Sequence, residues 1–139
     1  MIAYVDASVL LRVILGQSGA LPEWRSIETA IASALVQVEC LRTLDRLRLR
    51  TALPDATAIA HREAVYRLTE AMELVETGMP ILRRAAQPLP SPLGTLDAIQ
   101  LATALMWREA RDRDLVFATH DQALALAARG SGFRVIGMG

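Results

Sequence analysis

The sequence predicts an α/β fold in which a short parallel sheet is flanked by helices on both faces. Short apolar runs rich in β-forming residues alternate along the chain with longer stretches of helical periodicity. Strands that are separated by helices favour parallel pairing, because each helix returns the chain across the sheet before the next strand begins. The 139 residues fit a single domain, 1–139, and the 53% of hydrophobic residues is ample for a packed core.

Five strands are expected, and the first is the most clearly marked. Ile2 to Val5 is a short apolar run that ends at Asp6, as a buried strand does. The other strands are expected at 31–33, 72–75, 115–118 and 134–136.

Helices are expected between these strands. The first runs from Ala7 to Leu15 and is ended by a glycine-rich break at 16–19. Pro22 suits the first turn of a short helix that reaches about Thr29. Further helices are expected at 34–50, 56–71, 78–86, 95–111 and 121–128. Three prolines make 87–94 a loop, which is too short to divide domains.

Charge and cysteine content limit the functional classes. The formal net charge is +0, so the chain lacks the overall basic excess typical of nucleic-acid binders, although charge can still be segregated on one face. All basic residues are arginines, which excludes any mechanism that requires a lysine. A single cysteine, Cys40, and a start without a signal-peptide pattern favour the cytoplasm. No apolar run approaches the roughly 18 residues that span a bilayer.

Three acids are predicted at the functional end of the sheet. In open parallel sheets, ligands bind beyond the carboxyl ends of the strands. Asp6 ends the first strand, Asp121 follows 115–118, and Asp97 lies in the first turn of the helix that begins at Thr95. Each acid could instead be a simple helix cap. Crowded carboxylates repel one another, however, and a divalent cation such as Mg²⁺ or Mn²⁺ removes that repulsion.

Glu39 tests these alternatives, because it lies inside a helix and cannot be a cap. At 100° per residue, it shares one side of the helix with Arg42, Arg46 and Arg50, opposite the apolar residues Val36, Cys40, Leu44 and Leu47. One interpretation is an exposed Glu39–Arg42 ion pair. The other is a carboxylate on the wall of a cleft, with Arg42 and Arg46 placed to bind RNA phosphate. The spacing alone leaves both open.

Four segments of the sequence resemble the acidic motifs of PIN-domain nucleases. They are Tyr-Val-Asp-Ala-Ser at 4–8, Ser33 with Val-Glu-Cys-Leu-Arg at 38–42, Leu-Asp-Ala-Ile-Gln-Leu-Ala at 96–102 and Ala-Thr-His-Asp at 118–121. The resemblance covers essentially the whole chain, and the most similar subgroup is the VapC-type toxins of bacterial toxin–antitoxin pairs. The first and third motifs are the more specific ones.

This resemblance implies a PIN fold, Mg²⁺- or Mn²⁺-dependent endoribonuclease activity, a homodimer and inhibition by a cognate antitoxin. Asp6, Glu39, Asp97 and Asp121 would be the catalytic acids, with Asp6, Asp97 and Asp121 holding the metal directly or through water. Glu39 would bind the metal or orient the attacking water. Ser8 and Thr119 would be polar helpers that hold a carboxylate oxygen or a water in place, although Thr119 could equally be a helix cap.

Two other classes of protein compete with this interpretation. A receiver-like or phosphoryl-transfer domain could also place an acid after the first strand, but such families resemble an Asp-x-Asp motif or an acidic pocket with a lysine. Here Ala7 and Ser8 follow Asp6, and lysine is absent. A non-catalytic PIN-like module that binds RNA or protein is the stronger rival, and the four retained acids argue against it.

Overall fold

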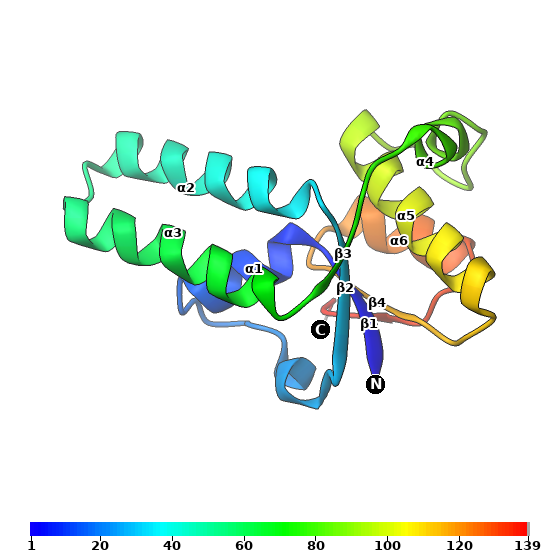
Figure 1. Cartoon of the computed structure of the whole chain (residues 1–139), viewed down its shortest axis with the longest axis horizontal. Helices are drawn as coiled ribbons and strands as arrows, with labels where there is room; N and C mark the ends of the chain where they lie inside the picture. The colour runs from blue at the N-terminus through cyan, green and yellow to red at the C-terminus, as the bar shows by residue number, and fades with distance from the viewer. Residues whose placement is uncertain (139) are drawn as a thin grey trace.

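The computed structural model describes residues 1–138 and confirms the predicted fold class (Figure 1). The strands are β1 (Ile2–Val5), β2 (Thr29–Ser33), β3 (Glu73–Val75), β4 (Val116–Ala118) and β5 (Val135–Ile136). They form one sheet in the order β3-β2-β1-β4-β5, and every neighbouring pair is parallel. The chain runs outward from β1 in both directions, so the point where the strand order reverses lies between β1 and β4.

The helices agree closely with the periodicity of the sequence. They are α1 (Ala7–Ile14), the 3₁₀ helix η1 (Pro22–Ser26), α2 (Val36–Thr51), α3 (Asp55–Glu70), α4 (Met79–Ala85), α5 (Thr95–Arg111) and α6 (Gln122–Gly130). Within residues 1–138, none of them combines the length and apolarity that crossing a membrane requires.

One boundary was predicted wrongly. Thr29 was expected at the end of a helix, but η1 ends at Ser26 and β2 already begins at Thr29. The reason is tertiary: Thr29 pairs with Ile2 in the parallel ladder, and the backbone N–H of Glu28 donates to the carbonyl of Met1 at 3.0 Å. The strand therefore extends beyond its apolar part, where side chains are more exposed.

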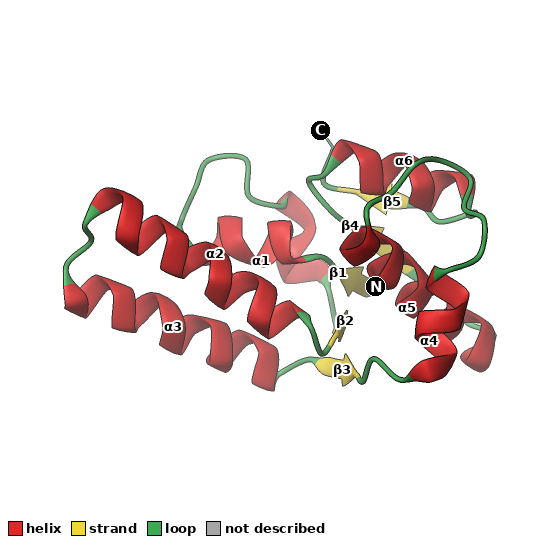
Figure 2. Ribbon diagram, turned by 90° about the horizontal axis from the view of Figure 1, so that it is seen from above, coloured by secondary structure: helices red, strands yellow, loops and turns green. Residues whose placement is uncertain are grey.

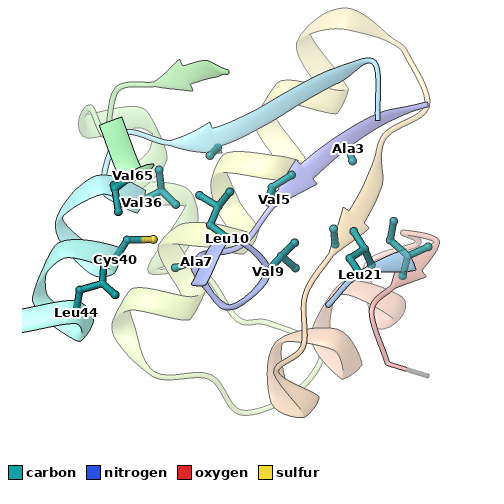
Figure 3. Packing of buried hydrophobic residues seen from close by; sticks show 13 residues of the cluster. Ala3, Val5, Ala7, Val9, Leu10, Leu21, Val36, Cys40, Leu44 and Val65 are labelled. Carbon is teal, nitrogen blue, oxygen red and sulfur yellow. The ribbon is translucent and has the colours of Figure 1, made fainter. Parts of the chain in front are cut away.

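Two groups of helices cover the two faces of the sheet (Figure 2), and alternating side chains of the strands pack against them. Ala3 and Val5 point to the side covered by α1, α2 and α3, where they belong to a buried cluster with Leu10 and Val36 (Figure 3). Tyr4 and the other residues of the second cluster, including Ile31 and Phe117, point to the side of α5 and α6. This alternation is the two-residue period of a strand.

The C-terminal strand closes tightly over the end of β4. The backbone N–H of Thr119 donates to the carbonyl of Ile136 at 3.1 Å. Gly137 then turns with φ of +106°, and its carbonyl lies 2.7 Å from Nδ1 of His120. A Cβ atom at Gly137 would lie 2.3 Å from the carbonyl oxygen of Thr119. Only glycine fits this close approach.

We expect Gly137→Ala to lower the free energy of unfolding by more than the roughly 1–3 kcal/mol of backbone strain alone, because Cβ would also overlap Thr119. Chemical denaturation followed by circular dichroism measures this loss. Gly16→Ala is the matched control: φ there is +61°, but nothing lies within 4 Å of the added Cβ. Equal losses in the two variants would contradict the close-contact explanation.

Candidate active site

Asp6 occupies the centre of the carboxyl end of the sheet. Val5 of β1 pairs with Ala118 of β4 in the ladder. The residues that follow these two strands, Asp6 and Thr119, therefore lie side by side. The backbone N–H of Asp6 donates to the carbonyl of Ala118 at 3.0 Å. Asp6 is only 6% exposed. It stands at the N-cap position of α1, yet its side chain makes no capping hydrogen bond, which contradicts the capping interpretation for this residue.

Two hydroxyl groups hold the Asp6 carboxylate instead. Ser8 Oγ donates to Asp6 Oδ2 at 2.7 Å, and Thr119 Oγ1 donates to the same oxygen at 3.0 Å. Each hydroxyl in turn accepts a backbone N–H at 3.0 Å, Ser8 from His120 and Thr119 from Asp121. Because a backbone N–H can only donate, the proton of each hydroxyl is directed at Asp6. Both residues thus contact Asp6 as expected, and the N-cap of α6 is Asp121 rather than Thr119.

Glu39 is not a solvent-exposed residue on the polar face of its helix. It is half-buried, and Nε2 of Gln100 on α5 donates to its Oε1. The alternative Glu39–Arg42 ion pair does not form, because Arg42 pairs with Asp45 at 3.0 Å. Helical geometry placed Glu39 on the correct helix but missed its partner, which comes from an element 61 residues away in sequence.

The remaining two acids differ from each other. Asp97 lies in the first turn of α5, where Gly94 is the N-cap and no side chain caps the helix. Asp121 does cap α6, because its Oδ1 accepts the backbone N–H of Leu124 at 2.9 Å. The capping interpretation is therefore correct for Asp121, although capping uses only one of its oxygens.

The four carboxylates are close enough to influence each other's protonation. Burial, together with the charges of Asp6 and Asp97, raises the pKa of Glu39 to about 7, whereas the hydrogen bond from Gln100 lowers it. Burial, then the charges of Asp121 and Asp6, raise the pKa of Asp97. The thiol of Cys40 also responds: burial and the charges of Glu39 and Asp6 raise its pKa to about 12. Negative charge is therefore concentrated around Asp6.

The chemistry of these donors fits a hard divalent cation. Carboxylate oxygens are the ligands that Mg²⁺ and Mn²⁺ prefer, and a cation relieves the repulsion that raises the pKa values of Glu39 and Asp97. Across residues 1–138, no three acidic, histidine or cysteine side chains converge on one point. Such convergence is not required of Mg²⁺, which usually binds one or two carboxylates and keeps several waters.

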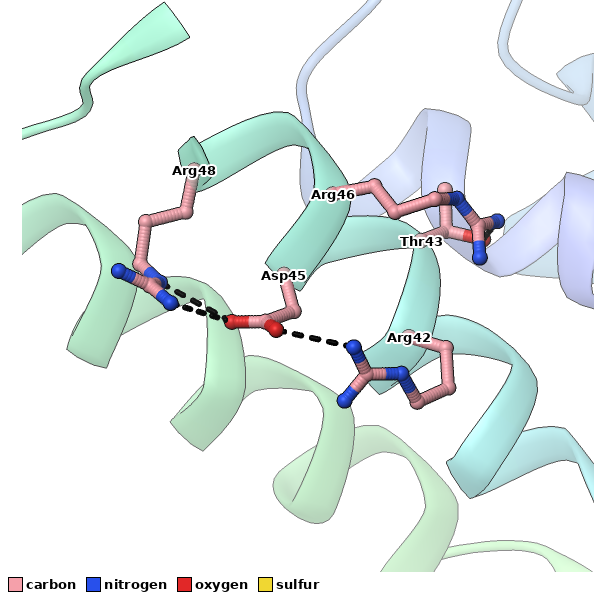
Figure 4. Close-up of polar contacts among 5 residues, drawn as sticks. All are labelled: Arg42, Thr43, Asp45, Arg46 and Arg48. Atoms are coloured by element: carbon pink, nitrogen blue, oxygen red, sulfur yellow. Dashed lines mark hydrogen bonds and ion pairs between the residues drawn. The ribbon is translucent and has the colours of Figure 1, made fainter. Parts of the chain in front are cut away.

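Arg42 and Arg46 lie further along α2, which projects away from the sheet together with α3 (Figures 1 and 2). Both are exposed. Asp45 holds Arg42 on one side and Arg48 on the other, at 3.0 and 2.9 Å (Figure 4). Arg46 donates to Thr43 Oγ1 at 3.1 Å. The two arginines thus remain at the surface of α2, and neither forms an ion pair with Glu39.

Three residues near the acids escaped the sequence analysis. Gln100 and Tyr4, both completely buried, connect to Glu39 by hydrogen bonds. Spacing carried a signal for them, since Gln100 is one helical turn after Asp97 and Tyr4 is two residues before Asp6, on the same face of the strand. Gly137 had no such signal, because only the tertiary structure brings it against Thr119.

The raised pKa of Glu39 predicts a pH-dependent stability. A carboxyl whose pKa rises from 4.5 to about 7 on folding binds its proton more tightly in the folded state. This contribution to stability is therefore present below pH 4.5 and is lost as the pH rises towards 7. We expect the Tm of the metal-free protein to fall over this range, and Glu39→Gln to weaken the decline.

Thermal unfolding at a series of pH values tests this expectation, with Glu63→Gln on the exposed side of α3 as the matched control. Mg²⁺ should raise Tm more at pH 7.5 than at pH 5, because protonated carboxyls do not bind it. An unchanged decline in Glu39→Gln would show that Glu39 does not titrate in this way.

Comparison with known proteins agrees with this fold. The chain is similar to the PIN domain family over residues 3–130. No curated protein sequence matches it significantly. Among solved structures, it is similar to a toxin–antitoxin complex from Klebsiella pneumoniae, with 17% identity, a TM-score of 0.67 and coverage of 96% of this chain and 95% of the other. It is also similar to PAE2754 from Pyrobaculum aerophilum, with 20% identity, a TM-score of 0.63 and coverage of 96% and 83%. The family match spans most of the sequence, and the chain therefore belongs to the PIN domain family.

Proposed function

We propose that this protein is a metal-dependent endoribonuclease toxin of the VapC type, which hydrolyses RNA phosphodiester bonds and is neutralised by a cognate antitoxin. The observation that carries the proposal is the mutual influence of the carboxylates at the end of the sheet, where the charges of Asp6 and Asp97 act on Glu39 and those of Asp6 and Asp121 act on Asp97. Membership of the PIN domain family supports a nuclease.

In this proposal Asp6, Asp97 and Asp121 hold Mg²⁺ or Mn²⁺. A bound divalent cation would supply stabilisation of charge on the phosphoryl oxygens and would make a water molecule more acidic. The hydroxyls of Ser8 and Thr119 both donate to Oδ2 of Asp6 and so orient the carboxylate. Oδ1 is then the oxygen that we assign to the metal. Asp121 combines its capping bond with a free second oxygen.

Glu39 is assigned the role of orienting the attacking water and accepting its proton. A general base works best when its pKa lies near the working pH. Burial, the largest cause, raises the pKa of Glu39 towards that range, and this cause persists when a cation offsets the charges of Asp6 and Asp97. Its hydrogen bond from Gln100 occupies Oε1, so Oε2 is the oxygen that we assign to the water.

The proposed partners are RNA, a cognate antitoxin and a second copy of the chain, in the cytoplasm. The toxin–antitoxin neighbour supports the antitoxin as a partner. Apolar surface for such contacts is available at the start of α5. A hollow of about 750 Å³ between α4, the proline-containing loop and the start of α5 is lined by Leu82, Leu89 and Leu93, and by none of the four acids.

We expect Asp6→Asn to abolish cleavage of a labelled RNA in Mg²⁺ or Mn²⁺, and EDTA to abolish cleavage by the wild type, because both remove the proposed metal. Gel analysis of the products measures this, with a DNA of the same sequence run in parallel. Asp114→Asn, an exposed acid before β4, is the matched control and should cleave normally. Undiminished cleavage by Asp6→Asn would refute the site, and RNA binding without products would favour the non-catalytic module.

The arginines of α2 give a second prediction. Arg42→Gln or Arg46→Gln should weaken RNA binding and reduce the slope of log K against log salt by about 0.7, the loss of one phosphate contact to a single strand. Fluorescence anisotropy in an Asp6→Asn background measures binding without cleavage. Arg25→Gln is the control, because Arg25 lies in η1 at the opposite end of the sheet. Equal effects at all three positions would indicate non-specific attraction.

A further inference from the structure

A buried chain of hydrogen bonds connects the main chain of β2 to the carboxylate of Glu39. The backbone N–H of Ser33 donates to Oη of Tyr4 at 3.2 Å. Tyr4 Oη donates to Oε1 of Gln100, and Nε2 of Gln100 donates to Oε1 of Glu39. The side chains of Tyr4 and Gln100 are completely buried. Each of the four residues comes from a different element: β2, β1, α5 and α2.

The donors and acceptors of this chain form one consistent series. A backbone N–H can only donate, so Tyr4 Oη accepts from Ser33, and it donates its own proton to Oε1 of Gln100. That proton requires an acceptor, which places Oε1 of the Gln100 amide towards Tyr4. The NH₂ group is thereby turned towards Glu39, whose Oε1 accepts its hydrogen bond. The reversed amide would set Oε1 against the carboxylate and leave the Tyr4 proton facing a donor.

Packing does not account for Gln100. Its neighbours in α5, Leu101, Ala102 and Ala104, are completely buried apolar residues. Burying an amide costs free energy unless its polar atoms are bonded, and a leucine would fill a similar volume without that cost. An amide at this position is favourable only because it bridges Tyr4 and Glu39.

We propose that Gln100 is a positioning residue for Glu39, and that Tyr4 fixes the orientation of the Gln100 amide. This inference rests on the proposed nuclease function, in which Glu39 must face the substrate water. Glu39 lies on α2, whereas Asp97 lies on α5, one turn before Gln100. The hydrogen bond therefore anchors the Glu39 carboxylate to the helix that carries Asp97. The same bond opposes the rise in the pKa of Glu39 that burial and neighbouring charge produce.

Tyr4→Phe is the sharpest test, because it removes a single oxygen and leaves the ring in place. Val65→Ala, in the core cluster on the other face of the sheet, is the matched control for a loss of core packing. Assays are run well below the Tm of each variant. We expect Tyr4→Phe and Gln100→Leu to lower kcat for RNA cleavage about 10–100-fold, the usual effect of losing an orienting partner. KM should change little, and Val65→Ala should retain wild-type kcat.

A second measurement needs neither metal nor RNA. In the ¹H–¹⁵N NMR spectrum of the metal-free wild type, the side-chain amide of Gln100 should exchange slowly with solvent. Gln100→Leu assigns this signal by removing it. In Tyr4→Phe, the amide loses its fixed orientation, so we expect a shifted signal with faster exchange, whereas Val65→Ala should leave it unchanged.

The two proposals fail in different ways. If wild type gives no RNA products, or Asp6→Asn gives as many, the nuclease function fails, while the NMR measurement still decides whether Tyr4 fixes the amide. If wild type cleaves and Asp6→Asn does not, wild-type kcat in Tyr4→Phe overturns the positioning role. An unchanged Gln100 signal in Tyr4→Phe overturns it as well.

Discussion

The pairing of β1 with β4 is the constraint on which the rest of the site depends. Because Val5 is opposite Ala118, the chain leaves both strands at the same level, and Asp6 meets Thr119 directly. The order of the strands reverses between these two, which is where parallel α/β sheets leave a crevice. A register shift of one residue would turn Asp6 to the opposite face and dismantle its contacts with Ser8 and Thr119. Gly137 contributes on the other side of β4, because it allows the C-terminal strand to approach Thr119 closely.

Concentrated negative charge is tolerated here because polar groups of defined direction surround it. The hydroxyls of Ser8 and Thr119 each accept a main-chain N–H and donate to Asp6. The Gln100 amide donates to Glu39 and accepts from Tyr4, which itself accepts the main-chain N–H of Ser33. In all three cases a main-chain donor at one end fixes the orientation of the side chain at the other. Such preoriented groups need little rearrangement when charge changes nearby. The acids without this support, Asp97 and Asp121, lie nearer the solvent at the starts of helices.

Local pattern was sufficient to predict the fold class, most element boundaries and the placement of Asp6, Asp97 and Asp121, whereas Glu39 was assigned to the acidic cluster through the PIN resemblance. The apolar run of β1 and the uninterrupted helical period from Thr95 to Arg111 are strong local signals. What failed depended on contacts between distant segments. The helix expected up to Thr29 gave way to a strand because Ile2 pairs with Thr29. The partner of Glu39 was missed because Gln100 lies on another helix, and the residue spacing within α2 contains no information about α5. Helical spacing alone suggested Glu39 as the ion-pair partner of Arg42. Asp45 lies at the same spacing on the other side of Arg42, and it is the residue with which Arg42 pairs.

The outermost strands of the sheet are very short, with three residues in β3 and two in β5. At β3, the carboxylate of Glu73 is further engaged by Trp107 Nε1 and by Arg111, which stacks on the Trp107 ring. Edges of this length present few free main-chain donors and acceptors, so they are poor templates for an added strand. Association by adding a strand to either edge of the sheet is therefore disfavoured, as is edge-to-edge aggregation. Recognition between this chain and any other protein is left to side chains on its helical surfaces.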